Sequence, residues 1–172
     1  MKPHDGKING TRASGLSTRT IAMSGVLAAL VVLATQIRIP TAVGYANLGD
    51  GLILAGGVLL GPVAFFPAAI GSALSDLIAG YPMFILPTFL IKGVMGWMTG
   101  YFLRRKPESF RRAALVFSLA ECWMIIGYFG TELILFGYEV AVAGLLPNLG
   151  QGIAGVFVGA LLYPVAVRGR KV

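Results

Sequence analysis

A small set of ionisable and amide side chains lies inside stretches that are otherwise apolar, where a charge is costly unless it lines a cavity or meets a partner. The set consists of Asn47, Asp50, Asp76, Lys92, Glu132, Asn148 and Gln151. Its ionisable members are three carboxyl groups and one amine. A pocket built from them would be slightly acidic, which favours a neutral or cationic ring bearing hydroxyl groups over an anionic ligand.

The spacing of these residues places several of them on shared helix faces. Tyr128 and Glu132 are four residues apart, and Asn148 and Gln151 are three apart, so each pair shares a face. Aromatic residues accompany them along the chain, namely Tyr45, Tyr81, Phe84, Tyr128, Phe129 and Tyr138. Aromatic walls with a few convergent polar groups are typical of a small-molecule site.

Each of these residues also has a purely structural interpretation. Asn47 and Asp50 could cap the start of a helix, and Asp76 could form an ion pair with Lys92 that ties two helices together. Tyr81 could belong to an interfacial aromatic belt. A further carboxyl group, Glu121, lies deeper in its apolar stretch and is expected to form a hydrogen bond within the bundle.

The elements that must position these residues are membrane-spanning helices. The 172 residues are 56% hydrophobic and 12% charged, whereas soluble domains carry about 25% charged residues. The apolar runs predict an all-α bundle of six spans, over 20–37, 47–60, 62–80, 87–103, 113–136 and 147–167. The first contains eighteen uncharged residues, enough for a helix of about 27 Å.

Basic residues cluster in three places: the N-terminal tail, the loop 104–112 and the C-terminal end. Six spans would place all three clusters on one side, and cytoplasmic loops accumulate Lys and Arg. The net charge of +7 is therefore a topology signal and does not indicate a nucleic-acid partner. We predict a polar cytoplasmic tail (1–18), one membrane domain (19–168) and a basic cytoplasmic tail (169–172).

This topology places the polar set near the outer ends of five helices, within about 5–8 Å of those ends. Two similar segments, Asn-Leu-Gly-Asp-Gly from 47 and Asn-Leu-Gly-Gln-Gly from 148, are expected to open the second and sixth spans. Their helix N-termini would then present free N–H groups outward.

The first span carries a face of small residues near its cytoplasmic end: Ala22, Ser24, Gly25, Ala28 and Ala29. Small residues let membrane helices approach closely, so this face is suited to docking against another subunit.

The sequence contains no Walker A motif, no cluster with metal-ligand spacing, and no Ser–His or Cys–His pair within the spans. We therefore expect neither an enzyme nor a bound cofactor or metal. Active transport would have to draw its energy from a gradient or from partner subunits.

Three segments resemble the S component of the energy-coupling-factor (ECF) transporters. They are Ala22-Met-Ser-Gly-Val-Leu-Ala-Ala29, the Asn-Leu-Gly-Asp segment at 47–50, and the run Gly-Ser-Ala-Leu-Ser-Asp-Leu-Ile-Ala-Gly-Tyr-Pro at 71–82 with Pro-Thr-Phe-Leu-Ile-Lys-Gly at 87–93. The last is the most specific part and is similar to S components for hydroxymethylpyrimidine, pyridoxine or riboflavin. The resemblance covers about residues 20–167.

The resemblance implies a multi-pass protein of the bacterial plasma membrane that binds a vitamin on its outer side. It implies partners as well: a membrane-embedded coupling protein, contacted by the first helix through Ser24/Ala28 or Gly25/Ala29, and two cytoplasmic ATPases that use ATP. Hydroxymethylpyrimidine or pyridoxine is the favoured substrate, with riboflavin as the third candidate.

Two other classes stay open on the sequence alone. One is a self-sufficient proton-coupled carrier or small channel that uses Asp76, Lys92 and Glu132 as relay groups. The other is an intramembrane enzyme or assembly factor, which would need a nucleophile–base pair.

Overall fold

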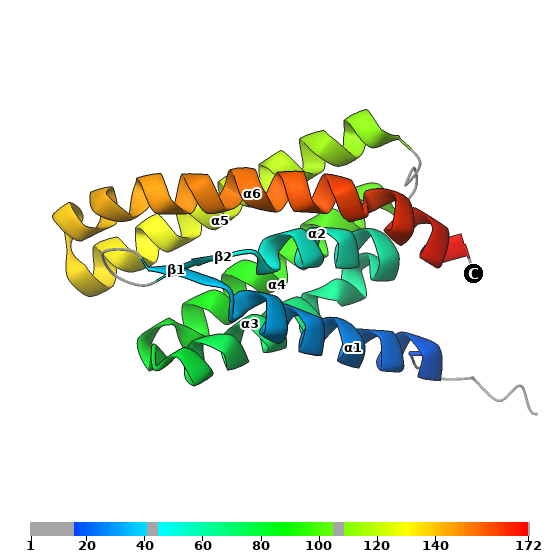
Figure 1. The fold of residues 1–172 in the computed structure, drawn as a ribbon, viewed down its shortest axis with the longest axis horizontal. Helices are drawn as coiled ribbons and strands as arrows, with labels where there is room; N and C mark the ends of the chain where they lie inside the picture. The colour runs from blue at the N-terminus through cyan, green and yellow to red at the C-terminus, as the bar shows by residue number, and fades with distance from the viewer. Residues whose placement is uncertain (1–15, 41–44, 105–108, 172) are drawn as a thin grey trace, which may run out of the picture.

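The structure, a computed structural model, describes residues 16–40, 45–104 and 109–171. Most of the predicted N-terminal tail, including Lys2, Lys7 and Arg12, lies outside the described residues, as do Arg105 and Lys106 of the basic loop. The described chain forms six α-helices and a short β-hairpin. The helices run alternately up and down along a common long axis (Figure 1).

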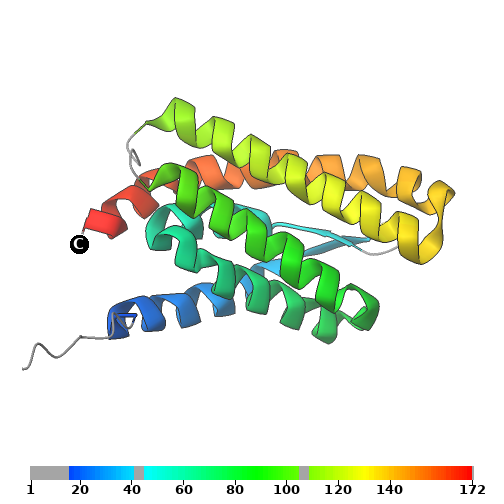
Figure 2. The same cartoon turned by 180° about the vertical axis from the view of Figure 1, so that it is seen from behind.

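The first half of the chain contains α1 (Thr18–Thr35), β1 (Arg38–Pro40), β2 (Tyr45–Asn47), α2 (Gly49–Leu60), the 3₁₀ turn η1 (Gly61–Ala64) and α3 (Phe65–Ala79). The second half contains the 3₁₀ turn η2 (Pro82–Phe84), α4 (Ile85–Leu103), α5 (Phe110–Phe136) and α6 (Tyr138–Lys171). Viewed from behind, α4 crosses between α3 and α5 (Figure 2).

Within the described residues, five helical stretches are long and apolar enough to cross a membrane, and one of them, Gly49–Ala79, holds both α2 and α3. Figure 1 shows the chain reversing direction between these two short helices. The reversal occurs at Gly61, whose φ of 66° lies in the left-handed region that favours glycine. Pro62 follows it at the start of η1. The protein is a helical membrane protein, and the number of six crossings stays a prediction.

The beginning of α1, the end of α4, the beginning of α5 and the end of α6 all lie at one end of the molecule (Figure 1). All the described basic residues except Arg38 and Lys92 gather at this end. Arg170 donates hydrogen bonds there to the carbonyl oxygens of Val58, Leu103 and Arg104, and Arg112 donates to that of Phe102. These bonds satisfy carbonyl groups that helix ends leave without a partner.

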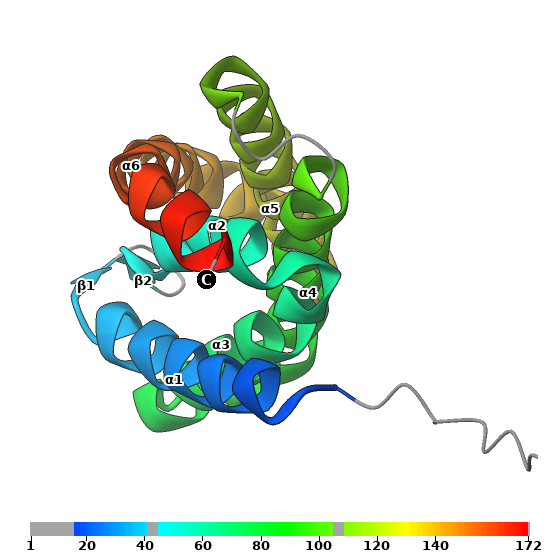
Figure 3. The ribbon, with the colours of Figure 1, turned by 90° about the vertical axis from the view of Figure 1, so that its right-hand side faces the viewer.

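Viewed from that end, α2 lies among the other helices (Figure 3), and most of its residues are buried. Glycines make this close packing possible. A methyl group on Gly57 would lie 2.6 Å from Thr99 Cβ, and one on Gly96 would lie 2.6 Å from the carbonyl oxygen of Ala64. Small residues at helix contacts therefore allow close van der Waals packing, which stabilises helix association where lipid provides no hydrophobic driving force.

Helix α6 corrects the predicted sixth span. It begins at Tyr138, directly after Gly137 (φ 90°), and continues through Pro147 and Pro164, whereas the sequence predicted a start at 147. Proline is tolerated inside membrane helices because neighbouring elements stabilise the interrupted segment, and α6 packs along both α2 and α5. Asn148 therefore lies inside the helix, about 15 Å from its start, and does not open it.

The β-hairpin was not predicted. Its strands pair antiparallel, with Arg38 opposite Asn47, Ile39 opposite Ala46 and Pro40 opposite Tyr45. The second strand delivers the chain to α2, where the Asn47 side chain accepts a 2.8 Å hydrogen bond from the N–H of Gly49. The N-cap of α2 is Leu48, which makes no side-chain capping bond, so Asn47 contacts the first N–H of the helix from one position before the cap.

Candidate binding site

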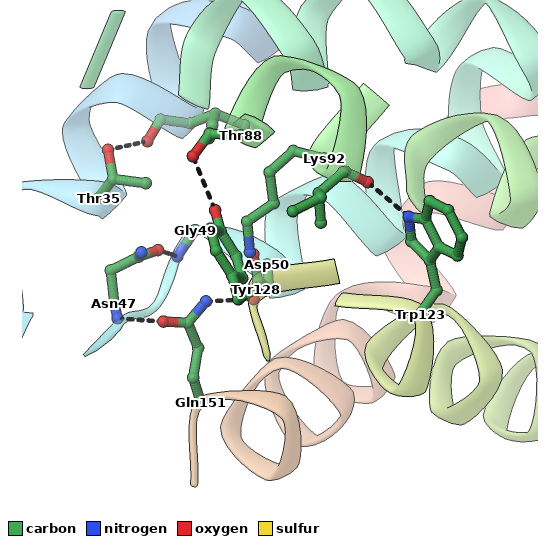
Figure 4. Close-up of polar contacts among 11 residues, drawn as sticks. Thr35, Asn47, Gly49, Asp50, Thr88, Lys92, Trp123, Tyr128 and Gln151 are labelled. Carbon is green, nitrogen blue, oxygen red and sulfur yellow. Dashed lines mark hydrogen bonds and ion pairs between the residues drawn. The ribbon is translucent and has the colours of Figure 1, made fainter. Parts of the chain in front are cut away.

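A buried polar cluster joins α2, α4 and α6 to the hairpin (Figure 4). Lys92 Nζ lies 2.5 Å from Asp50 Oδ1, and both side chains are almost inaccessible, at 3% and 1%. Gln151 Nε2 donates to Asp50 Oδ2 at 2.7 Å. The backbone N–H of Asn47 donates to Gln151 Oε1 at 2.9 Å. One carboxylate therefore organises three helices and the hairpin, and we name these four residues the central cluster.

Asp50 lies among groups that complement a carboxylate. It lies in the first turn of α2, where the partial positive charge of the helix N-terminus stabilises a carboxylate. Lys92 and Gln151 supply a counter-charge and a donor. The ion pair of Lys92 thus links α4 to α2 through Asp50, whereas the sequence-based alternative considered a pair between Lys92 and Asp76.

Aromatic rings form a wall that ends at this cluster. The ring of Tyr128 on α5 lies with its centroid 5.3 Å from Lys92 Nζ, and its hydroxyl shares a 3.0 Å hydrogen bond with Thr88. Phe84 packs against Tyr128 and Tyr81, with ring centroids 6.4 Å apart in each case. Phe136 lies 5.9 Å from Phe84. We name Tyr81, Phe84, Tyr128 and Phe136 the aromatic wall.

Three further predicted residues lie buried or half-buried around the wall. Asp76 on α3 is 7% exposed and close enough to Tyr128 for its charge to act on the phenol. Glu132 on α5 is 5% exposed, packs against Gly144 of α6 and lies beside Asn148. The predicted set therefore separates into the central cluster and a second group around Tyr128.

The predicted depth of the site requires a correction. Because α6 begins at Tyr138, Gln151 lies thirteen residues into it, about 20 Å from its first residue. The polar residues therefore do not form one layer 5–8 Å below the helix ends. Near their connection, α5 and α6 extend past the strands β1 and β2 (Figure 1).

The hairpin and α6 line an open cavity of about 390 Å³ beside the central cluster. Asn47 and Gln151 contribute polar groups to its wall, and Ile39, Pro40 and Leu146 contribute apolar surface. This volume is within the range of ligand pockets, about 300–1,000 Å³. A hydroxylated ring could use such a space with the central cluster beneath it.

Sequence reasoning missed Thr88 and the Trp123 side chain, whose Nε1 donates to the carbonyl of Ile91 at 3.2 Å. It also misplaced the contacts of Glu121, which is 3% exposed. Neither of its carboxyl oxygens has a hydrogen-bond partner among the described residues, so the expected bond within the bundle is not formed. Threonine is common in apolar helices, and nothing in its pattern marked Thr88.

The small-residue face of α1 divides into two sides. Ala22, Gly25 and Ala29 are exposed, and a methyl group on Gly25 would meet nothing within 4 Å. Ser24 and Ala28 are partly covered, and the carbonyl of Ala28 faces Gly71 of α3. Only the first side is available to another protein.

Comparison with known proteins agrees with this architecture. The model of the family described as "ECF-type riboflavin transporter, S component" matches residues 15–168. The chain belongs to this family. The S component is 35% identical over 131 residues to a Pyrococcus woesei protein described as "Uncharacterized protein in gap 3'region". The matched region is 76% of this chain and 87% of that protein. It also resembles the crystal structure of FolT bound with folic acid, with a TM-score of 0.62 and 26% identity over 86% of this chain and 98% of FolT.

The family match establishes the general role of the S component. It is a multi-pass membrane protein that belongs to a vitamin transporter and not to an enzyme family. The match also confirms the resemblance of the chain to the S components of ECF transporters.

Proposed function

We propose that this S component binds riboflavin between the hairpin, the aromatic wall and the central cluster. The observation that carries this proposal is that Tyr128 lies at the junction of the wall and the cluster. Riboflavin combines a neutral fused ring with a hydroxylated chain. Aromatic rings stack on the former, whereas carboxylate and amide groups form hydrogen bonds with the latter.

The family description, which specifies riboflavin transporters, supports riboflavin over the hydroxymethylpyrimidine or pyridoxine that the sequence favoured. Those rings are smaller and would contact fewer members of the aromatic wall. Folic acid, the ligand of FolT, is anionic and would meet the carboxyl groups of Asp50, Asp76 and Glu132, while Lys92 already pairs with Asp50.

Purified chain in detergent can be titrated separately with riboflavin, pyridoxine, hydroxymethylpyrimidine and folic acid by isothermal titration calorimetry. We expect riboflavin to bind at least 100-fold more tightly than the other three. Tighter binding of pyridoxine or hydroxymethylpyrimidine would transfer the assignment to that vitamin. Absence of binding by all four would reject a site of this kind.

Transport is proposed to require a coupling protein, which docks on Ala22, Gly25 and Ala29 of α1, and two ATPases. Exposed small residues on a membrane helix permit close approach by a partner helix, which supports this face over the covered Ser24/Ala28 pair. Liposomes that contain the chain alone should bind the vitamin without taking it up, and adding the coupling protein and ATPases with ATP should start uptake. Uptake by the lone chain would instead support a self-sufficient carrier.

A further inference from the structure

Helices α5 and α6 leave a second cavity, of about 510 Å³, on the side of the molecule. Its walls are mostly apolar and include Phe110, Ile125, Ile153, Val156 and Phe157. Ile153 and Phe157 are each 64% exposed, so the rim of this groove faces the surroundings of the helices. In a membrane protein that surface contacts lipid. A molecule dissolved in the bilayer could therefore enter the groove from the side.

One carboxyl group, that of Glu121, contributes to the wall of this apolar groove. Its side chain lies against α6 at two glycines: a methyl group on Gly152 would be 3.3 Å from Glu121 Cβ, and one on Gly155 would be 3.0 Å from Glu121 Cδ. The carboxyl group is buried, and both of its oxygens lack a hydrogen-bond partner among the described residues. A buried acceptor without a donor is costly and points to a missing partner.

The surrounding charges indicate the sign of that partner. Asp50 and Lys92 are the charged groups near enough to act on Glu121, and they already pair with each other at 2.5 Å. Cys122, on the same helix, is the other titratable group close by. An ionised Glu121 would therefore add a negative charge without its own counter-ion, at a depth where an uncompensated charge is expensive.

We propose that the α5–α6 groove binds a lipophilic aromatic cation, which enters from the bilayer and pairs with Glu121. The apolar walls accept the hydrophobic part of the ligand, and the phenylalanine rings at the rim can contact its charge or its rings. The carboxylate supplies the counter-charge and distinguishes a cation from a neutral or anionic molecule of the same shape. The volume of about 510 Å³ suits one molecule of drug-like size.

This site is separate from the proposed vitamin site. The vitamin site uses Tyr128, Gln151 and the hairpin, whereas the groove is lined by Glu121, by residues of α5 on both sides of it, and by residues of α6. The groove and the cavity beside the hairpin have no lining residue in common. A cation in the groove and a vitamin under the hairpin could therefore be bound at the same time.

Tetraphenylphosphonium is a suitable probe, and its binding to the purified full chain can be measured by equilibrium dialysis in detergent. We expect saturable binding that Glu121→Gln weakens at least tenfold. The matched control is Glu139→Gln, since Glu139 lies on an exposed turn at the start of α6, and this variant should bind as the parent does. Thermal unfolding in the absence of the probe shows that each variant is folded.

Two further measurements test the groove independently of the Glu121→Gln variant. Ile153→Trp fills the groove from its exposed rim and should also reduce binding at least tenfold. Tetraphenylborate, an anion of the same shape, should not bind saturably. Equal binding of the anion, or unchanged affinity in both Glu121→Gln and Ile153→Trp, would overturn the proposal and leave only partition of the probe into the detergent.

Discussion

Asp50 occupies the first turn of α2 and accepts from two side chains that come from other helices. Lys92 approaches it from α4 at 2.5 Å, and Gln151 approaches from α6 at 2.7 Å. Replacing one member of a buried ion pair leaves the other charge without compensation, whereas replacing both can be almost neutral. This asymmetry allows the structural and ligand-binding roles of the pair to be separated.

Asp50→Asn should therefore lower the free energy of unfolding by about 3–5 kcal/mol, because Lys92 keeps a buried charge without its partner. The double variant Asp50→Leu with Lys92→Met should recover most of this loss, because neither charge remains. Thermal unfolding in detergent measures both variants. Riboflavin affinity, measured by calorimetry on the same samples, should fall in both; a double variant with parental affinity would show that the pair serves stability alone.

At the scale of the elements, helix contacts depend on where glycine has no room for a side chain. Gly100 on α4 faces the turn between α2 and α3: a methyl group there would overlap the backbone of Gly61 and lie 2.6 Å from the nitrogen of Pro62. Gly150 on α6 is exposed, and a methyl group there would meet nothing within 4 Å. The two positions look alike in the sequence and differ only in what faces them.

The same substitution should consequently have opposite effects at these positions. Gly100→Ala should destabilise the protein by about 1–3 kcal/mol, because backbone atoms cannot move aside as a flexible side chain can. Gly150→Ala should be neutral or stabilising by up to about 1 kcal/mol, because alanine favours a helix over glycine. Unfolding temperatures in one detergent compare them, and equal losses at both positions would argue against the tight contact between α4 and the turn at Gly61 and Pro62.

Helix α1 offers a test of docking that does not disturb the bundle. A leucine at Gly25 has open space around it, so Gly25→Leu should leave vitamin affinity within about twofold of the parent. Uptake by the reconstituted complex should be lost, because the larger side chain keeps the partner helix from approaching. Ala143→Leu, at an exposed small residue of α6, is the matched control and should preserve uptake. Loss of vitamin binding in Gly25→Leu would show that Gly25 is needed for the folded structure of the S component, and would argue against a role limited to docking.

At the scale of the whole molecule, much of the helical architecture could be predicted from the sequence. Helices α1, α2, α4 and α5 begin within three residues of the expected positions, because long uncharged runs and basic flanks mark membrane helices strongly. The start of α6 was mispredicted because Pro147 looks like the first residue of a helix, and only packing against α2 and α5 explains why the helix passes through it. A three-residue strand carries too little periodicity to predict the hairpin.

The candidate site was predictable in its residue types but not in its pairings. Polar residues in apolar stretches are few, so their identification needed no structure. Which carboxylate meets Lys92 depends on how α2, α3 and α4 rotate about their axes, and helix spacing along the sequence does not contain that information. The exposure of Gly25 and Ala29, as opposed to Ser24 and Ala28, depends on the placement of α3 for the same reason.

The orientation of the molecule in the membrane is the remaining whole-molecule prediction. Tyr138 and Arg168 lie at opposite ends of α6 and are both exposed; thirty residues of helix separate them by about 45 Å, more than the roughly 30 Å of a hydrocarbon core. Positive residues favour the cytoplasmic side. In a Cys122→Ala background, which removes the exposed native thiol, Tyr138→Cys should react with a membrane-impermeant maleimide on intact cells, and Arg168→Cys should react only after permeabilisation. The reverse pattern would place the vitamin site on the cytoplasmic side and exclude uptake by this route.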